Sequence, residues 1–183
     1  MTARRLFLFV FLAALLAGLG CSNDSGGGST GPAFVCADGG NAAGNSVNTN
    51  CGGAIDSVTE RVDVVLGGPA AGTTTLRGLN FDVTYDPTKL VFVPDASYTS
   101  PLFPSALIAV SSPAAGRGIV GVQRQGADPP ISVGPGQYVV LGLTFQRAPG
   151  ATFAPTPVLF ENSDATGEST AITFASGTSI AYQ

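Results

Sequence analysis

The chain has 183 residues, of which 8 are basic and 12 acidic, and its net charge is −4. It contains no histidine, so the usual general base, the usual zinc ligand and every Ser-His or Cys-His catalytic pair are missing. Because only one lysine is present and the cations do not cluster, we expect no nucleic-acid partner.

The N-terminus has the pattern of a secretion signal. Two arginines precede an apolar run over residues 6–16, and small residues lie just before Cys21. This segment resembles a bacterial lipoprotein signal, in which residues 1–20 are removed and Cys21 carries the lipid. By the same resemblance, Ser22 after the cysteine favours sorting of the lipoprotein to the outer membrane. The domain would then face either the periplasm or the cell surface. Gly18 departs from the usual leucine of such signals, and ordinary cleavage nearby stays open.

A tether and a cysteine-closed segment follow the signal. Residues 21–32 are rich in glycine and serine and predict a flexible linker of about 15 to 20 Å. Residues 33–56 contain Cys36 and Cys51, an even pair that we expect to form a disulfide in an oxidising compartment. Such a bridge would stabilise the fold by about 3 kcal/mol.

The stretch between these cysteines is rich in glycine and asparagine and predicts a loop. Its oxygen donors are Asp38, Asn41, Asn45 and Asn48. Their spacing does not match the acidic pattern of a helix-loop-helix calcium site, and the stretch holds a single carboxylate. A solvated loop is therefore favoured over a calcium site.

From residue 57 onward, short apolar runs alternate with Gly and Pro clusters, and no window has helical periodicity. The predicted strands are residues 58–66, 79–85, 90–93, 106–111, 118–125, 138–147, 158–161, 171–175 and 179–182. Three prolines in residues 126–136 predict a loop without a central strand. About eight or nine strands in residues 57–183 predict an all-β, two-sheet antiparallel β-sandwich.

Residues 79–93, LNFDVTYDPTKLVFV, contain two apolar strands separated by one Asp-Pro turn. In the first strand a period of two places Leu79, Phe81, Val83 and Tyr85 on the same, core-facing side. Pro87 ends the strand because it has no amide proton, and Asp86 can accept hydrogen bonds from the next amides. The second strand begins at Leu90.

This stretch resembles the cohesin module, whose members carry an aromatic-x-hydrophobic-x-Tyr-Asp-Pro-x-x-Leu segment. The matching core is Tyr85, Asp86, Pro87 and Leu90, and the resemblance covers roughly residues 57–183. It implies a nine-stranded jelly roll and a non-catalytic module that docks a protein partner on one flat face. In that family the partner is a dockerin, a small calcium-loop domain often attached to polysaccharide-degrading enzymes.

Carboxylate chemistry is the remaining route to catalysis. Asp82 and Asp86 are the nearest pair, but a solvent-exposed strand face and a turn cap account for them. Glu161, Asp164 and Glu168 lie in a loop-like segment, where a solvated acidic loop is favoured over a cation site. We therefore expect no enzyme activity, no cofactor and no metal.

Two other functions stay open. A carbohydrate-binding module needs exposed aromatic rings for stacking on sugars, and the chain has no tryptophan and four tyrosines. Tyr98, Tyr138 and Phe103 are the candidate rings, although Phe103 could instead be a loop plug on the sandwich edge. The partner of such a carbohydrate-binding module would be a polysaccharide. The other open function is that of a purely structural envelope lipoprotein.

Overall fold

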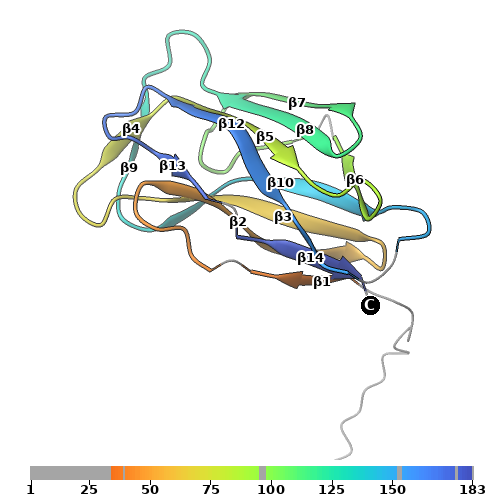
Figure 1. Cartoon of the computed structure of the whole chain (residues 1–183). Coiled ribbons are helices and arrows are strands. Elements are labelled where there is room, and N and C mark those ends of the chain that lie inside the picture. The colour runs from red at the N-terminus through yellow and green to blue at the C-terminus, as the bar shows by residue number, and fades with distance from the viewer. Residues whose placement is uncertain (1–33, 39, 95–97, 152–153, 176, 183) are drawn as a thin grey trace, which may run out of the picture. The chain divides into compact units, whose positions relative to one another are not determined.

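The computed structural model describes residues 34–38, 40–94, 98–151, 154–175 and 177–182. In these ranges the chain forms strands and no helix, so nothing helical in them could span a membrane (Figure 1). The strands are β1 (Phe34–Ala37), β2 (Ser46–Asp56), β3 (Thr59–Gly67), β4 (Thr74–Leu76), β5 (Gly78–Thr84), β6 (Leu90–Val93), β7 (Leu107–Ala114), β8 (Arg117–Gln123), β9 (Ile131–Val133), β10 (Gln137–Arg147), β11 (Thr156–Pro157), β12 (Leu159–Thr166), β13 (Thr173–Phe174) and β14 (Ser179–Tyr182).

Two sheets form the layers of a sandwich. One has five strands in the order β13-β2-β3-β10-β6, and the other has four in the order β12-β5-β8-β7. The four-stranded layer is uppermost in Figure 1, above β2, β3 and β10. Two smaller sheets, β1-β14-β11 and β4-β9, complete the described part. All strand pairs are antiparallel except β13 with β2, and the predicted jelly-roll type of β-sandwich is confirmed.

The core follows from the period-two patterns of the facing strands. Alternate side chains of β3 and β10 are fully buried, namely Val62, Val64, Leu66, Leu141, Leu143 and Phe145. The same core receives Leu79, Phe81, Val83, Val120 and Val122 from β5 and β8. Burial of each such side chain contributes about 1.5 to 3 kcal/mol, so this alternation is the main source of stability.

The predicted Tyr-Asp-Pro turn is confirmed. The amide of Thr88 donates a hydrogen bond of 2.9 Å to the Asp86 carboxylate, and the amide of Leu90 donates one of 3.0 Å to the Asp86 carbonyl. Tyr85 is 9% exposed and packs edge-on against Phe145, with ring centroids 5.4 Å apart. The segment therefore closes a turn and supplies one core ring.

The segment between the cysteines departs from the predicted loop, since residues 46–56 form the long strand β2. Val47 and Thr49 are fully buried and pair with Leu66 and Val64 of β3. Asn48, on the opposite side, donates a hydrogen bond of 3.3 Å to the carbonyl of Gly40. Asparagine is tolerated here because its amide finds a backbone partner.

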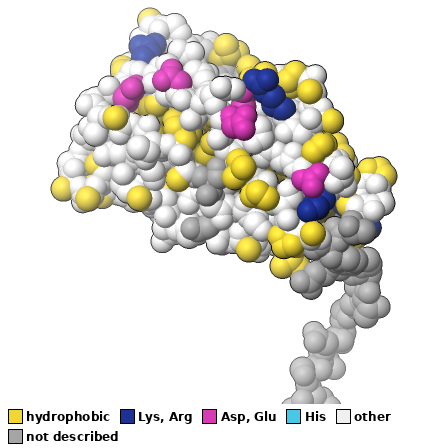
Figure 2. Space-filling view, in the orientation of Figure 1, with side chains coloured by type: hydrophobic (Ala, Val, Ile, Leu, Met, Phe, Trp, Pro, Cys, Tyr) yellow, Lys and Arg dark blue, Asp and Glu magenta, His cyan; other side chains and the backbone are white. Residues whose placement is uncertain are grey.

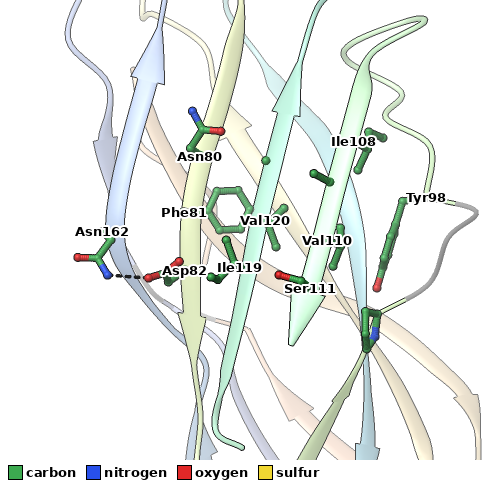
Figure 3. Close-up of a pocket in the computed structure, with 13 residues that line it drawn as sticks. Asn80, Phe81, Asp82, Tyr98, Ile108, Val110, Ser111, Ile119, Val120 and Asn162 are labelled. Atoms are coloured by element: carbon green, nitrogen blue, oxygen red, sulfur yellow. Dashed lines mark hydrogen bonds between the residues drawn. The ribbon is translucent and has the colours of Figure 1, made fainter. Parts of the chain in front are cut away.

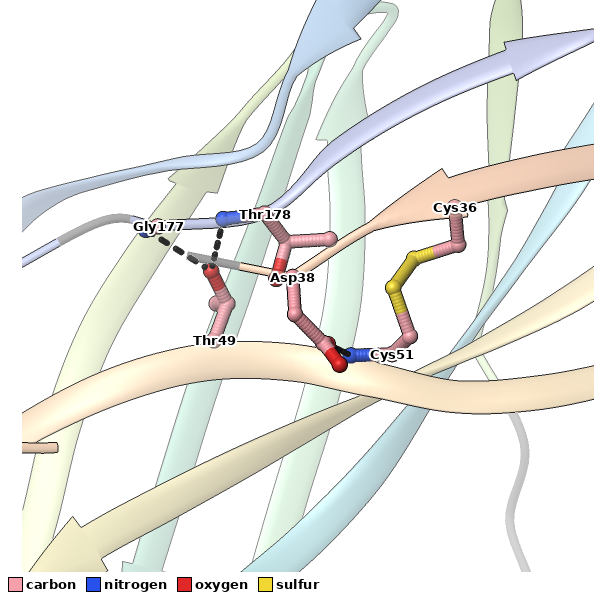
Figure 4. Close-up of a disulfide and its surroundings, with 6 residues drawn as sticks. All are labelled: Cys36, Asp38, Thr49, Cys51, Gly177 and Thr178. Carbon is pink, nitrogen blue, oxygen red and sulfur yellow. Dashed lines mark hydrogen bonds between the residues drawn. A yellow bond between two sulfur atoms is a disulfide. The ribbon is translucent and has the colours of Figure 1, made fainter. Parts of the chain in front are cut away.

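The predicted disulfide between Cys36 and Cys51 is present and joins β1 to β2 (Figure 4). Nearby, the Asp38 carboxylate accepts a hydrogen bond from the amide of Cys51. Asp38 therefore stabilises the β1–β2 connection, as a backbone hydrogen-bond acceptor. The described residues contain no group of three or more cysteine or acidic side chains that could hold a metal ion.

Two further segments differ from the sequence predictions. Residues 161–166, expected in a loop, continue β12 as far as Thr166, with a register shift between Glu161 and Asp164 that forms a bulge. Asn162 in this bulge has a φ of 44°, and asparagine is one of the few residues that adopt this region readily. Within the predicted loop 126–136, three residues form β9, and among the described strands it pairs with the short strand β4 alone.

Candidate functional site

The candidate site is the outer face, which we define as the side of β12-β5-β8-β7 that points away from the core. Strand register places its side chains in rows that cross the sheet. One row contains Glu161, Asp82, Ile119 and Ser111. The next contains Asp164, Asn80, Gly121 and Ala109. A shallow hollow of about 830 Å³ lies over these strands (Figure 3).

Asp82 lies at the centre of the outer face and is only 5% exposed. Its carboxylate accepts hydrogen bonds from Arg117 on β8, at 3.1 Å from Nε and 2.5 Å from the terminal nitrogen. On the other side, Asn162 donates one of 2.6 Å from β12 (Figure 3). The expectation of a solvent-exposed Asp82 is therefore wrong, because these two neighbours cover it.

The surroundings of Asp82 determine its charge state. Burial opposes ionisation, but the hydrogen bonds from Asn162 and Arg117 and the charge of Arg117 together lower the pKa of Asp82 below its ordinary value of 3.8. A carboxyl group with a lowered pKa is a poor proton carrier near neutral pH. Asp82 is thus a fixed, neutralised charge in the middle of the face.

Polar and apolar side chains both flank this ion pair, since Glu161 lies beside Asp82 on β12 and Ile119 lies beside it on β8. Ile119 is 38% exposed beside Asp82, while Leu159 and Leu107 on the two edge strands are 43% and 64% exposed. Gly121 keeps the hollow open, because a Cβ there would come within 3.0 Å of the Asn80 side-chain oxygen. Figure 2 shows acidic, basic and apolar side chains interspersed on one side of the molecule. Apolar area around a paired charge is typical of protein interfaces.

A second, smaller hollow of about 470 Å³ lies on the outward side of β3 and β10. It is lined by the ion pair of Arg61 and Asp63, whose Nε and carboxylate oxygen are 2.8 Å apart. Gly142 on β10 makes room for this pair, since a Cβ there would come within 2.7 Å of the Arg61 side chain. The outward side of the five-stranded sheet therefore also carries an Asp–Arg ion pair.

Only one of the three predicted ligand-facing rings lines the larger hollow. Tyr98 is half-buried, lines both the larger and the smaller hollow, and donates a hydrogen bond of 3.0 Å to the carbonyl of Val93. Tyr138 is half-buried on β10, in the other sheet. Phe103 is 1% exposed, so the prediction of an exposed ring is wrong and the loop-plug alternative holds.

The remaining predicted site residues lie elsewhere. Glu161 and Asp164 are exposed on β12, at one edge of the outer face, and Glu168 follows that strand. Cys21 lies outside the described residues.

Sequence reasoning missed Arg117 and Asn162, because a short motif carries no signal for contacts between distant strands. It also passed over Ile119 as part of the outer face. Val120 and Val122 both point to the core, so a period of two places Ile119 on the outward side of the strand. The only sequence signal was that this outward position carries an apolar residue.

No family model and no curated protein matches the chain. Among solved structures it is similar to cohesin domains. The sixth cohesin of scaffoldin B from Acetivibrio cellulolyticus, solved in complex with a mutant Cel5 dockerin, shares 16% identity with a TM-score of 0.53, over 74% of this chain and 99% of that one.

CaCohA2 from Clostridium acetobutylicum shares 18% identity with a TM-score of 0.53, over 74% and 90% of the two chains. The non-cellulosomal cohesin of the hyperthermophilic archaeon Archaeoglobus fulgidus shares 11% identity with a TM-score of 0.51, over 73% and 88%. The resemblance that the Tyr-Asp-Pro segment indicated is thus confirmed at the level of the fold.

Proposed function

We propose that this chain, which has the cohesin fold, is a non-catalytic module that binds a dockerin-type protein domain through its outer face. The observation that carries the proposal is the composition of that face: the exposed apolar side chains of Ile119, Leu107 and Leu159 lie on the same face as the paired charges of Asp82 and Arg117. A protein partner can bury Ile119 there without leaving an unpaired charge beneath it. The cohesin of scaffoldin B was solved with a dockerin, which supports this class of partner.

The test is a titration of the full chain with calcium-loaded dockerin domains, followed by calorimetry. Ile119→Arg should weaken binding at least tenfold, which corresponds to about 1.4 kcal/mol, because a new charge is buried in the interface. Val91→Arg is the matched control, since Val91 is 41% exposed but lies in β6 of the other sheet. Removal of calcium with a chelator should abolish binding.

Two outcomes would overturn this proposal. One is the absence of binding to every calcium-loaded dockerin domain tested. The other is an equal loss of affinity in the two arginine variants, which would mean that the outer face is not the docking surface.

A carbohydrate-binding function is the alternative, and its support is the half-buried ring of Tyr98 in the hollow. It predicts that the chain is retained on polysaccharides and that Tyr98→Ala or Tyr138→Ala removes the retention. Because stacking platforms usually present several aromatic rings in a row, one ring in the hollow favours the protein partner. If neither assay gives a signal, the structural envelope lipoprotein is the better description.

For location, we propose export across the inner membrane and a lipid anchor at Cys21 in the outer membrane. The support is the signal-like N-terminus with its small residues before the cysteine. Several acyl chains on one cysteine would make anchoring stable, at about 0.8 kcal/mol for each buried methylene. Cys21→Ala should release the chain from the membrane fraction and prevent labelling with fatty acid. An unlabelled wild-type chain would contradict this.

A further inference from the structure

A third hollow, of about 570 Å³, lies at the end of the four-stranded sheet where β8 ends and β7 begins. We call it the arginine hollow, and it is lined by Arg77, Leu107, Gln123, Arg124, Gln125 and Gly126. Sites for small ligands have volumes of roughly 300 to 1,000 Å³. The two hollows described above each have a carboxylate in their lining, whereas the charged residues that line this one are both cations.

The two arginines lie directly opposite each other, just beyond the paired parts of β5 and β8. The last pair of that ladder is Gly78 with Gln123. The amide of Arg124 donates a hydrogen bond of 2.9 Å to the carbonyl of Arg77, so the antiparallel register continues by one residue. Like charges at directly opposite positions repel each other and destabilise a sheet. An anion bound between the two guanidinium groups would remove this repulsion.

The acidic residues of the chain supply that negative charge only in part. The four ion pairs of the described residues leave out Arg77. Asp128 faces Arg124 at 3.5 Å, and its side chain is 46% exposed. The bond from Arg124 to the carbonyl of Pro104 is also 3.5 Å long, and the buried Nε of Arg124 has no hydrogen-bond partner among the described residues. Two arginines and one aspartate thus leave a single net positive charge at the hollow.

Arg77 is held in place without losing its charge. Its terminal nitrogen donates a hydrogen bond of 2.7 Å to the carbonyl of Gly126. Gly167 makes room for the stem of Arg77, because a Cβ there would come within 2.5 Å of the Arg77 Cγ. Glu168 follows Gly167 but forms no ion pair with Arg77 in the described part of the chain. A guanidinium that is positioned by a carbonyl keeps its other donors and its whole charge for a ligand.

The other lining residues match a ligand that has hydroxyl groups as well as a charge. Gln123 and Gln125 are exposed, and their side-chain amides have no hydrogen-bond partner among the described residues. Such an amide both donates and accepts hydrogen bonds, as a sugar hydroxyl does. Leu107 is 64% exposed and offers an apolar contact for the C–H face of a sugar ring. A carboxylate, several hydroxyls and a C–H face occur together in uronic acids.

We propose that the arginine hollow is a binding site for a uronic acid. Arg77 and Arg124 bind the carboxylate, and Gln123 and Gln125 bind ring hydroxyls. A guanidinium can hold a carboxylate through two parallel hydrogen bonds, and a uronic acid is singly charged at neutral pH. One net positive charge at the hollow therefore matches it better than a doubly charged phosphate.

This site goes beyond the proposed function, because it needs no protein partner and stands whether or not a dockerin domain binds. It also differs from the carbohydrate-binding alternative, which depends on the ring of Tyr98 in another hollow.

The test is an NMR titration of the isotope-labelled full chain with sodium glucuronate, without any partner protein and at constant ionic strength. The signals of Arg77 and Gln125 should shift until they saturate. Three probes should each bind at least tenfold more weakly than glucuronate. Glucose has a hydroxymethyl group in place of the carboxylate, acetate has the carboxylate without the hydroxyls, and inorganic phosphate carries a second negative charge.

Arg77→Gln and Arg124→Gln should each raise the Kd for glucuronate at least tenfold, because each removes a charged partner of the carboxylate. Gln125→Ala should raise it about threefold, since one neutral hydrogen bond is lost. Gln125 is exposed, so this variant tests the site even if an arginine variant fails to fold. Arg61→Gln is the matched control, because it makes the same change at a half-exposed arginine of the other sheet, and it should leave the Kd unchanged.

Circular dichroism spectra of the variants should match that of the unmodified chain. The proposal is overturned if glucuronate produces no saturable shift, or if folded Arg77→Gln binds it as tightly as Arg61→Gln does. An unchanged Kd in Gln125→Ala would overturn it as well. Equal binding of acetate and glucuronate would assign the hollow to carboxylates in general, such as acidic side chains of a protein, and would equally overturn the assignment to a uronic acid.

Discussion

The side chain of Asn162 donates a hydrogen bond of 2.6 Å to the carboxylate of Asp82, which lies 80 positions earlier in the chain. The bulge in β12 makes this contact possible, because it gives Asn162 a φ of 44° and a place beside the partner strand. Together with Arg117, Asn162 keeps Asp82 ionised although the carboxylate is almost fully buried. A backbone irregularity thus determines the electrostatics of the candidate site.

Asn162→Ala should destabilise the fold by about 1 to 2 kcal/mol, because it removes one hydrogen bond to a buried charged group. Urea denaturation followed by circular dichroism measures the loss. Ser163→Ala, at the exposed neighbouring position in the bulge, is the control and should change the stability by less than about 0.5 kcal/mol. Equal effects in the two variants would mean that the bond to Asp82 contributes nothing.

The stability of the chain should depend on pH through Asp82. Its pKa is lowered in the folded state, so it contributes stability above its ordinary pKa of 3.8 that is lost as the pH falls through the lowered value. Asp82→Asn should therefore be less stable than the wild type at neutral pH and approach it in acid. Urea midpoints measured for both proteins from neutral pH downward test this, and a constant difference would contradict it.

Glu60 should have the opposite pH dependence. This side chain is 2% exposed, and burial raises its pKa above the ordinary 4.5, against a smaller opposing effect of a hydrogen bond with the backbone of Gly53. A raised pKa means that the ionised carboxylate destabilises the fold at neutral pH. Each tenfold decrease in the acid dissociation constant on folding corresponds to about 1.4 kcal/mol of lost stability.

Glu60→Gln should accordingly raise the urea midpoint at neutral pH and leave it unchanged well below pH 4.5, where Glu60 is protonated in both states. Glu161→Gln, at an exposed position, is the control and should change little at either pH. A Glu60→Gln protein that is less stable than the wild type at neutral pH would show that the carboxylate is stabilising instead.

Removal of the Cys36–Cys51 bridge should lower the free energy of unfolding by about 3 kcal/mol, because the bridge closes a short loop that spans 15 positions. The double variant Cys36→Ala with Cys51→Ala, compared with the oxidised wild type in urea, measures this loss. A reducing agent should lower the wild-type midpoint by a similar amount and leave that of the double variant unchanged. An unchanged wild-type midpoint on reduction would contradict the expectation.

Local patterns predicted much of the sandwich. Residues 79–93 gave the two strands and the turn between them, because strict alternation and an Asp-Pro pair are short-range signals. For Phe103 the sequence left an exposed ring and a loop plug both open, because Pro-flanked residues often lie at the surface, whereas here the ring fills the core. Residues 46–56 were missed because asparagine and glycine have low strand propensity, and only pairing with β3 makes them a strand.

The candidate site could not be derived from the sequence in the same way. Asp82 was placed correctly on the outward side of its strand, but its burial depends on Arg117 and Asn162. These residues reach it from two other strands, and the sheet order that brings them together is a long-range property. The position of the bulge in β12 likewise has no signal in its composition.

The pairing of β1 with β14 determines how the domain would respond to a pulling force. Phe34 is opposite Tyr182 in this antiparallel ladder, so a load applied at these two residues would open it one pair at a time, as a zipper does. Two pairs further in, Cys36 is covalently joined to Cys51 in β2. Tension on β1 would pass through that bond into the central sheet, where many hydrogen bonds share it.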